Sequence, residues 1–243
     1  MRILVIADVH ANLPALDAVL DAAKAGGAID TVWCLGDVVG YGAQPGECID
    51  RLREYPNVTI AGNHDLAAVG IIGIEDFNPL AAAAITWTKS QLNDDQQAWL
   101  RGLPQVVIEG DFTLTHGSLR DPVWDYLLSP SLAEVNFRRQ TTPYCLVGHS
   151  HMPVAFRDGE ANIEGIVLGD GTVFNLDGTS FVANPGGLGQ PRDGDKRSCY
   201  ALIDTEAATI EFRRVEYDIE RAQAAMRAAY LPPHLIERLA RGR

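Results

Sequence analysis

The stretch TVWCLGDVVGYG, residues 31–42, places an aspartate directly after an apolar run. Residues 31–35 are typical of a buried strand, and Gly36 and Asp37 follow at once. In an open parallel sheet, ligands bind at the carboxyl ends of the strands. The position of Asp37 therefore predicts a functional carboxylate at the edge of such a sheet.

The sequence on both sides of this stretch alternates between strand and helix patterns. Residues 1–7 form an apolar run, residues 13–27 show helical spacing that stops at a glycine pair, and residues 29–35 are again strand-like. A helix pattern over 45–55 and a strand pattern over 57–62 follow. This alternation predicts a parallel sheet built from right-handed crossovers.

The second half of the chain is predicted to be mostly β. A helical middle over 66–101 precedes two short strands within 105–117, which read as a hairpin around a central glycine. Another apolar run covers 143–147, and turn signals separate short strands over 153–215. A polar helix is expected over about 218–230.

Length and composition favour one domain over residues 1–243, in which about 216–243 form a C-terminal helical tail. The closing RLARGR is expected to be a solvated, frayed end. No apolar stretch approaches the roughly 18 residues of a membrane helix, so we expect a cytoplasmic protein with no membrane partner. The net charge of -12 argues against binding to nucleic-acid polymers, and the four scattered cysteines are expected to be core residues.

Five of the six histidines follow strand-like runs, which random placement would not produce. A single histidine in such a place is usually a hydrogen-bonded surface residue, but strand ends in one sheet converge on a shared edge. Carboxylates gathered there would repel one another unless a cation neutralised them. The segments in question are Asp8-Val9-His10, Gly36-Asp37, Gly62-Asn63-His64-Asp65, His116-Gly117 and Gly148-His149-Ser150-His151.

The donor types indicate which cation. Aspartate, asparagine and neutral histidine offer oxygen and nitrogen without thiolate, which suits Mn, Fe, Zn, Ni or Co, with Mn favoured, over Ca or an iron–sulfur cluster. At least seven candidate ligands are too many for one ion that keeps open positions for water, whereas two divalent ions bridged by Asp37 account for them. A single-metal hydrolase would leave some of these histidines far from Asp8.

These blocks, in this order, resemble the calcineurin-like metallophosphoesterase superfamily, whose pattern is DxH, GD, GNHD or GNHE, a lone His and GHxH. Asn184-Pro185-Gly186-Gly187 resembles the later NPGS block of its small single-domain bacterial and archaeal members. The resemblance implies an α/β fold: a four-layer αββα sandwich of two mixed β-sheets flanked by helices. The chain departs from the family pattern at two positions. Gly40 stands where many members have the second Asp of GDxxD, and Gly187 stands where serine is usual.

The resemblance also implies roles for individual residues. One metal would be held by Asp8, His10, Asp37 and His151, and the other by Asp37, Asn63, His116 and His149. His64 would face the substrate as a catalytic, non-ligand histidine, with Asp65 as its orienting partner.

The implied activity is hydrolysis of small phosphomonoesters or phosphodiesters, with nucleotides among the candidates, by a hydroxide that bridges two metal ions. His64 would protonate the leaving oxygen or stabilise its charge. Asn63, His64 and Arg192 are the candidate substrate-binding residues, although the turn that holds Arg192 is also consistent with a solvated surface. A phosphoprotein phosphatase and a non-catalytic metal-binding scaffold remain as alternatives.

Overall fold

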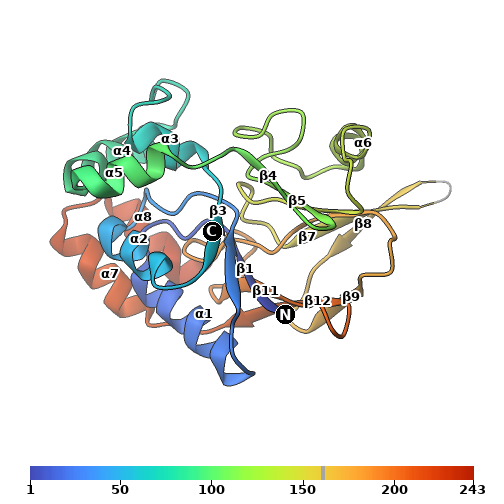
Figure 1. Ribbon diagram of the computed structural model, residues 1–243. Helices are drawn as coiled ribbons and strands as arrows, with labels where there is room; N and C mark the ends of the chain where they lie inside the picture. The colour runs from blue at the N-terminus through green and yellow to red at the C-terminus, as the bar shows by residue number, and fades with distance from the viewer. Residues whose placement is uncertain (160–161) are drawn as a thin grey trace.

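The computed structural model describes residues 1–159 and 162–243 and shows two mixed six-stranded sheets packed face to face, with helices outside them (Figure 1). The sequence-based expectation of an αββα sandwich is confirmed. The first sheet has the order β3 (Asn57–Thr59), β2 (Thr31–Cys34), β1 (Arg2–Ile6), β11 (Ser198–Asp204), β12 (Thr209–Val215) and β9 (Thr172–Asn175). The second has the order β4 (Val106–Glu109), β5 (Phe112–Thr115), β6 (Tyr144–Leu146), β10 (Phe181–Asn184), β7 (Val154–Asp158) and β8 (Ile163–Val167).

Each sheet combines a parallel part with an antiparallel part. Strands β1, β2 and β3 are parallel, as the alternating pattern predicts, and β11 joins β1 in antiparallel register. In the second sheet β6 pairs in parallel with β5 and β10, while β4 and β5 form the expected hairpin. The carboxyl ends of β1, β2, β3, β5 and β6 can therefore contribute loops to a single site.

The helices cover the outer faces of the sheets. Residues of α1 (Leu13–Ala25) and α2 (Pro45–Arg53) pack on the first sheet, and α6 (Pro130–Phe137) packs on the second (Figure 1). The predicted helical middle consists of α3 (Asn63–Ala68), α4 (Pro79–Gln91) and α5 (Asp94–Arg101), with a loop over 69–78. The sequence pattern did not indicate α6.

Strand β1 shows how the layers are built. Ile3 and Val5 lie in the core between the sheets, whereas Leu4 and Ile6 lie in the cluster beneath α1. Because successive side chains of a strand point to opposite faces, a strand covered on both faces needs a continuous apolar run. The run at the start of the sequence is explained by this double burial.

The C-terminal tail is the main correction to the sequence-based account. Helices α7 (Ile219–Ala228) and α8 (Pro233–Arg238) are followed by a short 3₁₀ turn at Leu239–Arg241. Leu235, Ile236 and Leu239 are buried in a cluster with residues of α4 and α7, and Gly194 N donates a hydrogen bond to Gly242 O over 2.8 Å. The prediction of a frayed end is wrong because apolar side chains on one face of α8 anchor it.

All four cysteines are buried and free, as expected of core residues. None of the helices in the described part of the chain is long and apolar enough to cross a membrane.

Candidate metal centre

The loops that follow five strands meet at one edge of the sandwich and bring the seven predicted ligands together, all of them buried. Backbone hydrogen bonds connect these loops. Asp8 N donates to Gly36 O over 3.0 Å, His10 N to Asp37 O over 2.9 Å, and Gly148 N to His116 O over 2.9 Å. The last of these lies in the second sheet, so both sheets contribute to the centre.

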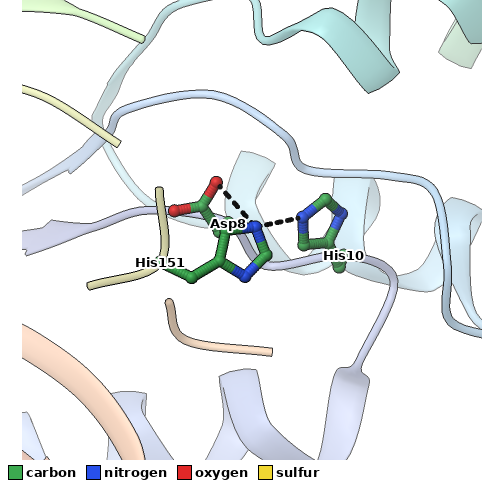
Figure 2. Close-up of side chains that lie close together, drawn as sticks. All are labelled: Asp8, His10 and His151. Carbon is green, nitrogen blue, oxygen red and sulfur yellow. Dashed lines mark hydrogen bonds and ion pairs between the residues drawn. The ribbon is translucent and has the colours of Figure 1, made fainter. Parts of the chain in front are cut away.

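Asp8, His10 and His151 form the first group of possible ligands, and their donor atoms lie within 4.8 Å of one another (Figure 2). His151 Nε2 lies 3.5 Å from Asp8 Oδ1 and 3.1 Å from His10 Nε2. His10 Nδ1 faces Val39 O at 3.1 Å, and His151 Nδ1 faces Gln190 O at 2.6 Å.

The tautomers of these two histidines follow from their partners. A carbonyl oxygen only accepts, so each Nδ1 carries the proton and each Nε2 presents a lone pair. Two lone pairs 3.1 Å apart repel each other, whereas a cation bound to both nitrogens would turn that repulsion into coordination. Holding Nδ1 to a backbone carbonyl is also the usual way in which proteins orient a metal-ligating histidine.

Asp37, His116 and His149 form the second group, again with donor atoms within 4.8 Å. Asp37 Oδ2 lies 3.4 Å from His116 Nε2 and 3.6 Å from His10 Nε2, so one oxygen faces both groups. The other oxygen, Oδ1, accepts a hydrogen bond from His64 N over 2.9 Å. A single carboxylate oxygen therefore lies between the two groups.

Asn63 belongs to the second group by position. Its Oδ1 lies 3.3 Å from His116 Nε2, while His116 Nδ1 faces Leu35 O at 2.7 Å. Among the described residues, the buried atoms Asp8 Oδ2 and His149 Nε2 have no hydrogen-bond partner. Buried polar atoms without partners are costly, and these two are placed to bind a cation.

The pKa values of the buried centre show that charge on these side chains is costly without a partner. Burial raises the pKa of Asp8 to about 7 and lowers the pKa of His149 to about 3. Burial alone would lower the pKa of His116, but the charge of the Asp37 carboxylate raises it to about 9. A proton on His116 thus takes part of the place that a metal ion would fill.

The backbone of these loops is strained at the same residues. Nine non-glycine residues in the described part of the chain have positive φ angles, and five of them are predicted ligands. Such conformations cost about 1–3 kcal/mol each and persist where the surroundings enforce them. The five are Asp8 (φ 56°), His10 (48°), Asp37 (54°), His149 (64°) and His151 (57°).

His64 lies beside the two groups, and its donor atom is within 4.8 Å of those of His10 and Asp37. Its Nδ1 is buried without a hydrogen-bond partner in the described structure, and burial lowers its pKa to about 4. Gly40 explains the close packing around the ring, because a Cβ built on it would lie 2.3 Å from His64 Nδ1.

Asp65 does not hydrogen bond to the His64 ring. Its Oδ1 accepts from Val39 N over 3.1 Å and its Oδ2 from Gly62 N over 3.0 Å. This carboxylate therefore ties the loop after β2 to the start of α3.

The Asn184-Pro185-Gly186-Gly187 block holds the loop that carries His149 and His151. Asn184 Nδ2 donates to Gly148 O over 2.5 Å and to Ser150 Oγ over 2.9 Å. A Cβ at Gly187 would lie 2.9 Å from the Cβ of His151. Glycine in place of serine is therefore matched to a close approach of the His151 loop.

A cleft opens above the ligands. Its other lining residues include Tyr41, Phe77, Trp124, Tyr126 and Arg192. Of these, only Arg192 was predicted from the sequence, because Phe77, Trp124 and Tyr126 lie on loops without a periodic pattern. Arg192 is partly buried, its Nε has no hydrogen-bond partner in the described structure, and its guanidinium lies 5.8 Å from the Tyr41 ring centre.

Three comparisons place the chain among known proteins. The sequence model of the calcineurin-like phosphoesterase superfamily domain matches residues 1–208. The crystal structure of a metallophosphoesterase from Sphaerobacter thermophilus is 44% identical, superposes with a TM-score of 0.91, and the match covers 100% of this chain and 99% of that one.

The chain is also similar in sequence to two curated relatives. An uncharacterized protein of Methanocaldococcus jannaschii is 36% identical over 247 residues, which cover 99% of this chain and 98% of the relative. A symmetrical bis(5'-nucleosyl)-tetraphosphatase of Actinobacillus pleuropneumoniae is 30% identical over 130 residues, or 51% of this chain. The match spans about half the length of that relative, 47%.

Proposed function

The chain belongs to the calcineurin-like phosphoesterase superfamily and is a phosphoric ester hydrolase, and we propose that it uses two divalent metal ions to hydrolyse small phosphomonoesters or phosphodiesters. The observation that carries this proposal is the position of Asp37 Oδ2, which lies 3.6 Å from a donor of the first ligand group and 3.4 Å from a donor of the second. A shared oxygen of this kind suits a pair of ions.

The proposed ligands are those of the two groups. Asp8, His10 and His151 would hold one ion, His116, His149 and Asn63 the other, and Asp37 both. Ions held there would supply a Lewis acid for the phosphoryl oxygens and a hydroxide nucleophile near neutral pH. Because the donors are carboxylate, amide and imidazole without thiolate, Mn, Fe, Zn, Ni and Co are the suitable metals, and Mn is our first choice.

His64 would act on the leaving oxygen. With its pKa lowered to about 4, mainly by burial, the ring is neutral at pH 7 in the metal-free site and offers one N–H. A neutral ring of this kind is better suited to donate a hydrogen bond to the charge that develops on the leaving oxygen than to act as a general acid that is protonated before substrate binds.

Arg192 would bind the phosphoryl group. It lines the cleft, and no carboxylate lies within 4 Å of it in the described structure. A guanidinium held in this way matches phosphate geometry. By contrast, Arg197 in the same turn pairs with Asp195 at 2.7 Å and Asp170 at 3.2 Å, so it stays a surface residue.

The proposed substrates are small, and nucleotides are the first class to test. The centre lies at the base of a cleft and its ligands are buried, which suits a compact ester better than a folded phosphoprotein. The relation to symmetrical bis(5'-nucleosyl)-tetraphosphatases over half of the chain supports the same choice.

The test is hydrolysis of p-nitrophenyl phosphate and bis-p-nitrophenyl phosphate by metal-stripped protein, with Mn, Ni, Co, Zn and Mg added back one at a time and bound metal counted. We expect activity to return at about two ions per chain. The ratio of the two rates separates a monoesterase from a diesterase. Full activity without metal, or saturation at one ion, would overturn the proposal.

A further inference from the structure

Three aromatic side chains form one wall of the cleft, and we call Phe77, Trp124 and Tyr126 the aromatic wall. Phe77 and Trp124 contact each other, and Phe77 and Tyr126 each contact a histidine of the centre. Phe77 lies edge-on to His64 with ring centres 5.1 Å apart, and Trp124 lies edge-on to Phe77 at 5.0 Å. Tyr126 stacks on His149 with ring centres 4.1 Å apart and an angle of 26° between the planes.

Packing explains part of this wall but not all of it. Phe77 and Trp124 are partly buried against hydrophobic clusters formed by α4 and by Leu66 with Val123. Tyr126 belongs to none of the clusters in the described part of the chain and is 48% exposed. An aromatic side chain that lines a cleft, stacks on a proposed metal ligand and leaves about half of its surface open is available to a ligand.

We propose that the aromatic wall binds a planar aromatic group carried by the phosphoester, as a nucleobase is carried by a nucleotide, with Tyr126 as the main contact. The inference rests on the proposed function for the position of the phosphoryl group at the metal centre. Stacking on an aromatic side chain recognises the flat face that every base has, so the wall selects for a planar group without selecting one base.

Charge in the cleft agrees with this division of the substrate. Arg192 lies beside Tyr41, so the cleft offers a cation for the phosphate as well as flat apolar surface for the attached group. A phosphoester without a planar group would use only the cation and the metal centre.

The experiment measures binding, so that it does not depend on turnover. Manganese-loaded protein is titrated with the non-hydrolysable phosphonate analogues of adenosine 5'-phosphate and of ribose 5-phosphate, which differ only in the base. We expect the adenosine analogue to bind about five- to a hundred-fold more tightly. A second pair, phenylphosphonate and cyclohexylphosphonate, tests an aromatic ring attached directly to phosphorus and so distinguishes a small aryl ester from a nucleotide.

Three variants assign the preference to the ring. Tyr126→Ala should reduce the preference for the adenosine analogue at least about five-fold and leave the ribose analogue unaffected, whereas Tyr126→Phe should keep the preference. Leu128→Ala is the matched control, because Leu128 lies two residues away with the same 48% exposure and does not line the cleft. Bound manganese is counted in every variant.

The outcomes separate the two proposals. Equal binding of both members of both pairs by the wild-type protein would overturn the aromatic wall. So would a Tyr126→Ala protein that loses manganese, or that binds both sugar phosphonates more weakly than the wild type by the same factor, because the ring would then only support His149. A wild-type protein that prefers the adenosine analogue but hydrolyses no phosphoester with any metal would overturn the proposed function and leave the binding site standing.

Discussion

Two regions of this chain treat their charged side chains in opposite ways. In the surface cluster formed by residues 170, 193, 195, 197, 213 and 214, each arginine lies within 4 Å of an aspartate. In the metal centre, Asp8 Oδ2 and His149 Nε2 are buried with no partner in the described structure, and His10 and His151 turn lone pairs toward each other.

The difference separates charges that are paired within the protein from charges that a bound ligand would compensate. Solvent-exposed ion pairs contribute about 0–1 kcal/mol each, so the exposed pairs that Asp170 makes with Arg197 and Arg213 can be altered at little cost. Buried carboxylates and imidazoles are expensive unless a cation or a proton compensates them. We expect mutations in the two regions to differ in the same sense, and the predictions test that difference.

The largest effect is expected from Asp37→Asn. The amide keeps the shape of the side chain but removes the charge that faces both ligand groups, so metal should be lost along with the transition-state stabilisation it provides. We expect activity on p-nitrophenyl phosphate to fall on the order of 10³-fold or more, and bound metal to fall below two ions per chain.

Asp170→Asn is the matched control for Asp37→Asn. Asp170 is about one-third exposed and pairs with Arg197 at 3.2 Å and Arg213 at 3.3 Å. We expect unchanged metal content and activity, and a free energy of unfolding within about 1 kcal/mol of the wild type. Similar losses in both variants would remove the contrast between the two regions.

The ligands of this centre could be predicted from the sequence because the ends of the strands can be recognised in it. Asp8, Asp37 and His149 follow apolar runs, and parallel topology then brings those ends to one edge. The placement of Phe77, Trp124 and Tyr126 in the cleft could not be predicted, because tertiary contacts, and not a periodic pattern, determine where their loops lie. Asp121, for example, accepts hydrogen bonds from Val123 N and Trp124 N within one such loop.

The C-terminal tail has an amphipathic pattern that the sequence-based prediction passed over in favour of its basic ending. Pro233 at the first helical position, followed by Leu235, Ile236 and Leu239, has the spacing of an amphipathic helix. Its basic ending suggested a solvated tail, whereas the apolar face determines where the tail lies. The hydrogen-bond partners of Asp65 could not be predicted for another reason, because the choice between a ring and two backbone amides depends on distances that the sequence does not contain.

A smaller effect than that of Asp37→Asn is expected from Gly40→Ala. Gly40 has a φ of 87°, and its Cβ would lie 2.3 Å from His64 Nδ1, so the methyl group must displace the ring. We expect activity to fall about ten- to a hundred-fold, because the displaced ring stabilises the leaving oxygen less well, with two metal ions still bound. The backbone strain should also cost about 1–2 kcal/mol of unfolding free energy.

Gly171→Ala isolates the strain in Gly40→Ala. Gly171 has a φ of 84° and no atom within 4 Å of its would-be Cβ, so it carries the same backbone penalty without touching the site. We expect a similar loss of stability by chemical denaturation and wild-type kinetics. Equal activity in the two alanine variants would show that His64 does not depend on Gly40.

The smallest effect concerns the proton on His116. In the metal-free protein its Nδ1 faces Leu35 O at 2.7 Å and its Nε2 faces Asp37 Oδ2 at 3.4 Å, so both ring nitrogens have acceptors. Burial opposes the charged ring, but Asp37 raises its pKa to about 9. At pH 7 the ring is therefore protonated, and it must release that proton before Nε2 can bind a metal ion.

Metal affinity should accordingly rise with pH, by about tenfold per unit between pH 7 and 9 if one proton is released, and level off above the pKa. Calorimetric titration with manganese at pH 7.5, in two buffers of different ionisation enthalpy, measures the protons released. We expect about one from His116 in addition to a fraction from Asp8, whose pKa burial raises to about 7. His234→Gln, at an exposed position of α8, should leave that number unchanged. Binding without proton release would mean that His116 is already neutral. The buried centre would then need a cation less than the comparison with the surface cluster implies.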